Sequence, residues 1–475
     1  MKNWRQWVAS RSFGCALWVA LCFGLTSAVY LSWLNRMVAL AGGAAADWLS
    51  MGAGYLFQAA GMGLVCLLLR RRPGADMKRF FTLSTLLFAL ISTPALLTDS
   101  VTGVICFGLL MNLLCGVIAG LYLFAVGQNV AADRRGVVFG GGYALATVGV
   151  GLLALIGRGS LLHGRYALLI HIPFALLALL TAFRLGLFDA GEEAPAPAQG
   201  AEGKTEGCLA LACATVVMLS AVKNMGFGFP SADIEAGLIP ELSRLPYAIG
   251  LAVAGWISDR DRKNGMLCTL AALILPFIML GLTNEIVSST ICWGLDYLFF
   301  GFFSVFRVVL FLDIAARTRR WELAPLGLLM GRIGDAAGTG AGILLSGSKL
   351  ALIVVTAALF FPTVYLCFCL YRRLYEPEVV QQRSEQEIFE AFCLHNDLSP
   401  REREVLRMVI DNRSNGEIAE ALFITESTVK YHVRNVLQKA GCKNRNELQR
   451  KYTLALYPQL KTTVLQLMPT QEDAG

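Results

Sequence analysis

The chain has 475 residues, of which 56% are hydrophobic and 16% are charged, and its formal net charge is +7. This composition excludes an ordinary soluble protein, because the apolar residues occur in runs of about 20, the length that crosses a hydrocarbon layer roughly 30 Å thick. The 13 cysteines stand mostly alone within these runs, and the 4 histidines are scattered. Neither a disulfide framework, a metal or cofactor site nor an enzyme is therefore expected.

Twelve membrane-spanning helices are predicted, six before and six after a central linker. The first six cover Phe13–Leu34, Trp48–Leu69, Phe80–Leu97, Val101–Val126, Val138–Gly157 and Ala167–Gly186. The second six cover Cys208–Met225, Pro246–Ser258, Met266–Leu282, Ser289–Ile314, Leu323–Leu345 and Leu350–Tyr371. The eighth span is short and is expected to begin earlier, near Leu238. The predicted fold class is therefore all-α, with a membrane bundle over residues 1–375.

The linker, residues 187–206, combines Pro, Ala, Gly and acidic residues without large apolar ones, so it cannot bury a core of its own. Positive charge is concentrated in alternate loops, including residues 70–79, 260–263 and 317–320. Because loops rich in Lys and Arg remain in the cytoplasm, these loops and both termini are assigned to the cytoplasm of a multi-pass cell-membrane protein. The C-terminal region then faces the compartment that holds DNA.

Charged side chains within apolar runs are costly in a bilayer and are therefore candidate ligand contacts. His171 and Arg307 are among these residues, and the four proposed as ligand contacts are Lys223, Asp296, Arg332 and Asp335. Arg332 and Asp335 are three residues apart, so they share one helix face and can pair with each other. Lys223 and Asp296 lie in the seventh and tenth spans, which are expected to meet around a central cavity. The alternative is that these residues form structural ion pairs.

Two further features of the second half have a structural interpretation. Arg307 and Asp313 lie toward the end of the tenth span, where the alternative is a span drawn too long. Gly334, Gly338 and Gly342 are spaced four apart, and such a ridge of small residues predicts close packing against another helix.

The arrangement of six plus six spans with a long central loop resembles the major facilitator superfamily. After the eighth span, where that superfamily repeats its G-x-x-x-D-R-x-x-R-K signature, stand Gly255, Asp259, Arg260, Arg262 and Lys263. The glycine allows close helix approach, and the aspartate can pair with an arginine across helix ends. The alternative is a positively charged loop with a chance Asp-Arg pair. Residues 70–74, after the second span, lack the Asp-Arg core, which argues against active transport more than against the fold.

A small soluble domain of four short helices is predicted over residues 398–457, after a connector at 376–397 and before a tail at 458–475. The connector has a short amphipathic stretch around Phe389 and Phe392. Ser399 and Ser414 each precede a glutamate by three residues, which is the capping box that begins a helix. Thr425 caps the third helix, and the fourth begins at 444.

The third helix has two different faces. Its apolar residues recur at helical spacing and predict a face turned to a core: Val429, Val433, Val436, Leu437 and Ala440. The opposite side carries Lys430, Tyr431 and Arg434. A basic face that is not needed for the core, following a tight turn, is typical of a helix that enters the DNA major groove. The alternative is a solvated helix in a protein-binding module.

Residues 398–452 resemble the LuxR/GerE family of transcription regulators, which carry a helix-turn-helix. The matching residues are Leu398, Ser399, Glu402, Glu404, Val405, Asn415, Glu417, Ile418, Ala419, Leu422, Thr428, Val429, Lys430, His432, Lys439 and Arg445. The DNA contacts that the resemblance implies are Thr428, Lys430, Tyr431, Arg434, Asn435 and Lys439. Of these, Lys430, Tyr431 and Arg434 are expected to face base edges, whereas Thr428 and Lys439 are expected to hold phosphates.

The function predicted is that of a membrane-bound one-component regulator whose membrane domain senses a small ligand or a membrane state. Its expected partners are double-stranded DNA, the lipid bilayer, a small molecule, and a second copy of the chain through the fourth helix near Asn446–Leu454. One alternative is a major-facilitator-type transporter with an autoregulatory DNA-binding tail. Another is a protein-binding tail without affinity for DNA.

Overall fold

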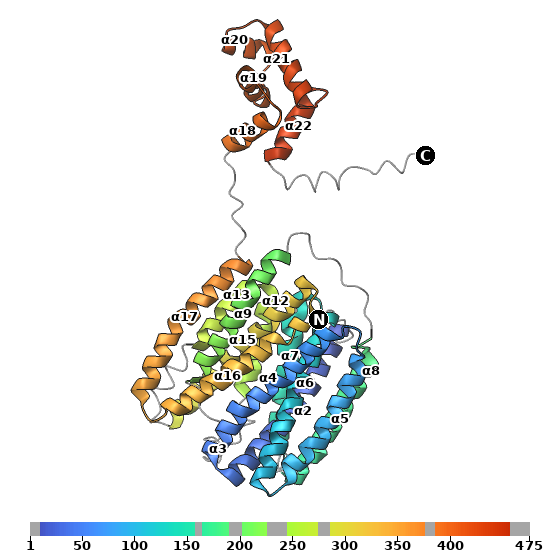
Figure 1. The fold of residues 1–475 in the computed structure, drawn as a ribbon, viewed down its shortest axis with the longest axis vertical. Coiled ribbons are helices and arrows are strands. Elements are labelled where there is room, and N and C mark those ends of the chain that lie inside the picture. Colours follow the sequence, from blue (N-terminus) through green and yellow to red (C-terminus); the bar gives the residue numbers. More distant parts are fainter. Residues whose placement is uncertain are drawn as a thin grey trace. The chain divides into compact units, whose positions relative to one another are not determined.

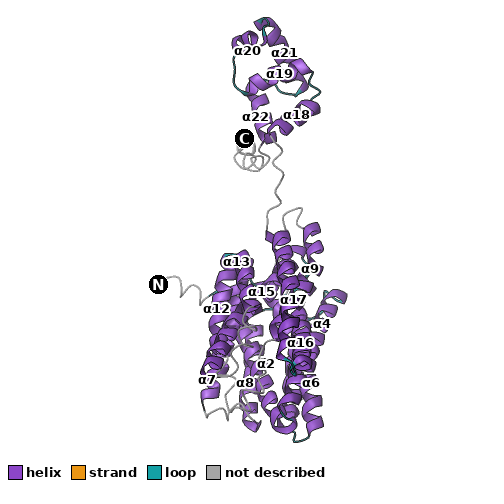
Figure 2. Ribbon diagram, turned by 90° about the vertical axis from the view of Figure 1, so that its left-hand side faces the viewer, coloured by secondary structure: helices purple, strands orange, loops and turns teal. Residues whose placement is uncertain are grey.

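The computed structural model describes residues 10–156, 164–189, 202–225, 245–273, 286–375 and 385–456. The chain divides into two compact units, Met1–Tyr375 and Glu376–Gly475. Throughout the described ranges the regular elements are helices (Figure 2).

The first half of the membrane unit forms one helix, or one helical stretch, for each predicted span. Its helices are α2 (Arg11–Ala41), α3 (Gly43–Asp47), α4 (Tyr55–Arg71), α5 (Met77–Leu97), α6 (Val101–Asn129), α7 (Arg135–Leu155) and α8 (Leu168–Leu185). A π-helical turn, η1 (Trp48–Gly54), joins α3 to α4 within the second span. Ser10, Asp76 and Ser100 accept backbone N–H bonds at the beginnings of α2, α5 and α6, which satisfies donors that the helix leaves free.

The second half packs beside the first, as the green-to-orange helices do beside the blue-to-cyan ones in Figure 1. Its helices are α9 (Glu202–Met225), α12 (Leu245–Arg260), α13 (Arg262–Thr269), α15 (Ile286–Thr318), α16 (Leu326–Leu345) and α17 (Lys349–Tyr375), and a 3-10 turn, η5 (Leu270–Leu273), continues α13. Because α9 begins at Glu202, the last residues of the predicted linker are helical. Residues 190–201 of that linker and the expected beginning of the eighth span near Leu238 lie outside the described residues.

Within the described residues, nine helical stretches are long and apolar enough to cross a membrane. Helix α16 is not among them, because Arg332 and Asp335 lower its hydropathy. The tenth predicted span corresponds to α15, which continues to Thr318. Arg307 and Asp313 therefore both lie inside a helix.

The glycine ridge of α16 packs against α9. A Cβ atom on Gly334 would overlap the carbonyl oxygen of Val217, and one on Gly338 would overlap that of Ala221. The predicted role of the ridge is confirmed, since only glycine lets the two backbones approach this closely. The approach also brings Lys223 of α9 beside α16, where Asp335 lies.

Substituting Gly338 with alanine is expected to lower the free energy of unfolding of the membrane unit by about 1–3 kcal/mol, the cost of overpacking a close contact. Thermal unfolding of the detergent-solubilised chain measures the effect. Gly141→Ala is the matched control, because Gly141 also lies in a helix but a Cβ there meets nothing within 4 Å. Equal stability of the two variants would contradict the packing role of Gly338.

The C-terminal unit comprises five helices around one core. They are α18 (Glu385–His395), α19 (Pro400–Ile410), α20 (Asn415–Leu422), α21 (Glu426–Lys439) and α22 (Arg445–Leu456). The sequence placed α18 in the connector, but Phe389, Phe392 and Cys393 are buried in the same core as α19 to α22. The rings of Phe389 and Phe392 both contact Tyr452 edge-on, with centroids 6.2 and 5.4 Å away.

Helix beginnings in this unit follow the predicted capping chemistry. Ser399 and Ser414 form capping boxes with Glu402 and Glu417. The hydroxyl oxygen of Thr425 accepts the backbone N–H of Thr428 at 3.3 Å and begins α21. Because this unit has its own core and its own caps, we expect residues 376–475 to fold without the membrane unit.

Candidate DNA-binding surface and membrane cavity

Helix α21 has one face in the core and one face in solvent. Val429 and Val436 are buried, whereas Lys430, Tyr431 and Arg434 are exposed. Tyr431 is 62% exposed, so its ring is available for contact with a partner. We call the exposed surface of Lys430, Tyr431 and Arg434 the basic face of α21. It presents two cations and one flat ring.

A tight turn between α20 and α21 fixes the direction of the basic face. Phe423 ends α20 in the left-handed conformation, with φ of +54°, and the N–H of Ile424 bonds the carbonyl of Ala419 at 3.0 Å. This arrangement is the Schellman closure, which satisfies the last carbonyls of a helix and reverses the chain. Thr425 then begins α21 at once, so the two helices form a helix-turn-helix.

The other predicted DNA contacts differ from one another. Thr428 and Asn435 are half-buried at the edges of α21. Lys439 is expected from the family resemblance to contact a phosphate, and in the structure its Nζ donates to Oε2 of Glu402 at 2.7 Å and to the carbonyl of Asp397 at 2.9 Å. These bonds tie α21 to the beginning of α19.

Glu402 is the buried partner in this tie. Burial alone raises the pKa of the Glu402 carboxyl, but hydrogen bonds from Lys439 and Ser399 outweigh it and lower that pKa below its ordinary value of 4.5. A lowered pKa in the folded state means that the charged carboxylate stabilises the fold. This contribution is complete above pH 4.5 and is lost as the pH falls through the lowered pKa.

Glu402→Gln is therefore expected to destabilise the C-terminal unit by about 1–2 kcal/mol at neutral pH, from the lost charged hydrogen bonds. Below pH 4.5 its stability should converge with that of the parent chain. Urea unfolding of residues 376–475, followed by circular dichroism at several pH values, measures this. Glu404→Gln removes a half-exposed carboxylate and should have little effect. If the difference in stability between Glu402→Gln and the parent chain stays constant with pH, the charged bond between Lys439 and Glu402 does not stabilise the fold.

The membrane unit contains a cavity of about 120 Å³ between its two halves. Side chains from the first half include Tyr30, Tyr55 and Tyr122, and Tyr247 and Phe300 line the second half. Of the predicted ligand contacts, Lys223, Arg332 and Asp335 lie in the cavity wall. Asp296 lies in α15, but its side chain lies outside the described residues.

Asp335 is the centre of a buried charge cluster in the cavity wall. Its Oδ2 lies 3.3 Å from Nη1 of Arg307 and 3.5 Å from Nη1 of Arg332, and its Oδ1 lies 3.8 Å from Nζ of Lys223. The predicted pairing of Arg332 with Asp335 is thus present. Arg307, for which the sequence left a structural explanation open, also lies in the cavity wall.

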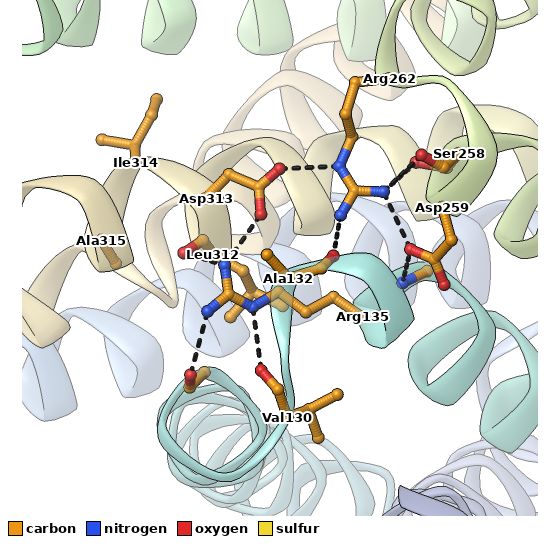
Figure 3. Close-up of polar contacts among 12 residues, drawn as sticks. Val130, Ala132, Arg135, Ser258, Asp259, Arg262, Leu312, Asp313, Ile314 and Ala315 are labelled. Carbon is orange, nitrogen blue, oxygen red and sulfur yellow. Dashed lines mark hydrogen bonds and ion pairs between the residues drawn. The ribbon is translucent and has the colours of Figure 1, made fainter. Parts of the chain in front are cut away.

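A second polar network joins helix ends of both halves (Figure 3). The carboxylate of Asp259 accepts the backbone N–H groups of Gly136 and Val137 at 2.7 and 2.6 Å, at the beginning of α7. It also accepts Nη1 of Arg262 at 2.8 Å. The predicted pairing of the aspartate with an arginine is confirmed, and Arg262 is the partner, whereas Arg260 lies against the ring of Trp256.

Arg262 and Arg135 extend this network to α15. Asp313 accepts Nε of Arg262 and Nη1 of Arg135, each at 2.8 Å (Figure 3). Arg262 also bonds the carbonyls of Ser258 and Ala132. The network therefore fixes one end of α7, α12, α13 and α15 relative to one another.

Comparison with known proteins gives separate matches for the two units. The family model "Bacterial regulatory proteins, luxR family" matches residues 396–452. The spore germination protein GerE of Bacillus subtilis (strain 168) is 44% identical over 50 residues, 10% of this chain and 68% of GerE. The nitrate/nitrite response regulator protein NarL of Escherichia coli (strain K12) is 48% identical over 52 residues, 11% of this chain and only 24% of NarL.

The membrane unit is similar to a solved transporter. The crystal structure of the human organic anion transporter MFSD10 (TETRAN) aligns with a TM-score of 0.51 and 14% sequence identity. The alignment covers 76% of this chain and 98% of that one. At this identity the likeness concerns the fold alone, and it confirms the predicted major-facilitator-like bundle.

Proposed function

Because the chain belongs to the luxR family of bacterial regulatory proteins through its C-terminal unit, we propose that it regulates transcription from the membrane. In this proposal the C-terminal unit reads a specific DNA sequence, and the membrane unit senses a small ligand or a membrane state. The observation that carries the proposal is the basic face of α21, which projects from a helix-turn-helix whose core is complete without it.

The basic face suits the major groove of DNA. Arg434 can donate two parallel bonds to a guanine, and Lys430 can donate to the same base type, whereas Tyr431 offers an apolar ring and a hydroxyl. In this proposal Thr428, at the edge of α21, bonds a phosphate and so fixes the register of the helix, and Asn435 is a further DNA contact. Lys439 is left out of this surface because it bonds Glu402.

We expect the C-terminal unit to bind as a dimer, with its recognition helices about one DNA turn apart. Helix α22 is covered on one side by α18, through Phe392 and Tyr452. Its opposite side keeps Asn446 and Arg450 exposed, and this side is the proposed dimer surface. With the basic loops in the cytoplasm, both termini and the DNA-binding unit are cytoplasmic in this proposal.

The DNA-binding half is tested with a fragment of residues 376–475 and sheared genomic DNA at low salt, where phosphate contacts are strongest. We expect selection of fragments that share an inverted repeat. A double variant, Lys430→Ala with Arg434→Ala, should select none. Absence of binding by the parent fragment at low salt would reject the regulator and favour a protein-binding tail.

The sensing half is tested by comparing the full chain with the same fragment on an operator-driven reporter. A signal can shift the membrane unit only by binding two of its conformations unequally. The reporter response should therefore require residues 1–375. A response that persists with the fragment alone would reject sensing by the membrane unit.

A transporter with an autoregulatory tail is the second candidate function. The observation that favours it is a polar cavity between two halves of a major-facilitator-like bundle. Accumulation of a labelled cavity ligand inside sealed proteoliposomes, against its gradient, would support transport. Binding without accumulation would support a sensor.

A further inference from the structure

Positive charge predominates in the wall of the membrane cavity. Among the described residues that line it, Lys223, Arg307 and Arg332 are cationic and Asp335 alone is anionic. Arg307 and Asp335 are almost fully buried, with 3% and 1% exposure. Since charges in the hydrocarbon region are retained in pairs or at functional sites, two arginines that share one carboxylate indicate a functional site.

The two guanidinium groups are incompletely bonded. Arg307 and Arg332 both direct an Nη1 atom to the same oxygen of Asp335, at 3.3 and 3.5 Å. These distances exceed the roughly 2.7–2.9 Å of a charge-assisted bond. The Nε atoms of both arginines are buried, and among the described residues neither has a hydrogen-bond partner. A planar arginine with a free Nε–H is suited to bind a second anion.

Aromatic rings surround these cations and form flat walls. The ring of Tyr55 lies 4.2 Å from the guanidinium carbon of Arg332, and the ring of Phe300 lies 3.7 Å from Nζ of Lys223. Tyr247 stacks on Phe300 with an interplanar angle of 18°. Such rings hold the cations in place and leave apolar surface for the body of a ligand.

We propose that the cavity binds an organic anion with an aromatic body, whose carboxylate, sulfate or phosphate group lies between Arg307 and Arg332. This inference rests on the proposed sensing function and names the class of its ligand. The anionic group supplies an acceptor for the Nε atoms of Arg307 and Arg332, and the ring of the ligand packs against the tyrosines and Phe300. The ligand thereby contacts α15 and α16 of one half and Tyr55 of the other.

The test uses the full chain in nanodiscs of phosphatidylcholine, which has no net charge. Thermal unfolding is followed with increasing phenylacetate, with neutral phenylethanol, with cationic phenethylamine, and with acetate, which lacks the ring. Phenylacetate should raise the unfolding midpoint in a saturable manner. Its affinity should exceed that of each other probe at least tenfold.

Two substitutions locate the site. Arg307→Gln and Arg332→Gln should each weaken the phenylacetate response at least tenfold, whereas Arg36→Gln, which changes an arginine outside the cavity, should leave it unchanged. If a cavity variant does not fold, the comparison of probes on the parent chain decides alone.

Several results would overturn the proposal. These are no stabilisation by phenylacetate, equal affinity for phenylethanol or acetate, tighter binding of phenethylamine, or an undiminished response in folded variants of both arginines. DNA binding by residues 376–475 is measured separately. Failure of anion binding and failure of the proposed regulator are therefore distinguishable.

Discussion

Arg434→Ala is expected to weaken operator binding by the C-terminal unit at least tenfold. A bidentate contact from arginine to a guanine contributes about 1–3 kcal/mol of discrimination, and Arg434 is exposed at the centre of the basic face. The loss should be greater for the selected operator than for scrambled DNA, because base contacts carry the sequence information. Fluorescence anisotropy titrations of both DNAs with residues 376–475 measure the two affinities.

Lys443→Ala is the matched control for Arg434→Ala. Lys443 is also exposed and basic, but it lies in the turn after α21 and not on the basic face. Its removal should lower the affinity for both DNAs slightly, and equally. Suppose that Lys443→Ala and Arg434→Ala lower the affinity for operator DNA and for scrambled DNA to the same extent. Then α21 does not read bases, and the basic face attracts DNA only through its positive charge.

Asp335→Asn is expected to destabilise the membrane unit by about 3–5 kcal/mol, the cost of breaking a buried ion pair and leaving its partners uncompensated. Asp335 is 1% exposed and is shared by Arg307, Arg332 and Lys223. Neutralising it leaves three cations in one wall. Thermal unfolding in nanodiscs without added anion measures the loss.

Asp99→Asn makes the same chemical change at an exposed site. The side chain of Asp99 is 94% exposed and pairs with Arg36, and exposed pairs contribute little. Its unfolding midpoint should match that of the parent chain. If Asp335→Asn is also as stable as the parent chain, the charge cluster around Asp335 does not stabilise the membrane unit.

Local chemistry made much of the C-terminal unit predictable. A capping box needs only a serine and a glutamate three residues later, so the beginnings of α19 and α20 at Ser399 and Ser414 follow from the sequence. The bond between Lys439 and Glu402 does not, because 37 residues separate its partners and only the packed domain brings them together. The sequence pattern alone therefore predicts a DNA contact for Lys439 and does not predict its bond within the domain.

Phe389 illustrates the same limit for α18. Its amphipathic pattern predicts a helix, but a pattern cannot say which surface covers the apolar face. In the structure Tyr452 of α22 covers it. The family match begins at residue 396, after this helix.

In the membrane unit, apolar length predicted the helices, but the charge cluster was predicted only in part. Arg332 and Asp335 are neighbours on one helix turn, so their pairing follows from spacing. The second arginine of the cluster, Arg307, reaches Asp335 from α15, 28 residues away along the chain. This contact depends on the close approach of α15 and α16, which a hydropathy pattern does not predict.

The central claim is that this chain, while it is in the membrane, occupies specific DNA. The most direct measurement is genome-wide crosslinking of the full chain in a bacterial host that produces it, with the membrane fraction isolated before DNA recovery. We predict enrichment of sites that share one inverted repeat, and loss of that enrichment in the double variant of Lys430→Ala and Arg434→Ala. Recovery of the same DNA with parent and double variant, or of no enriched site, would contradict the account.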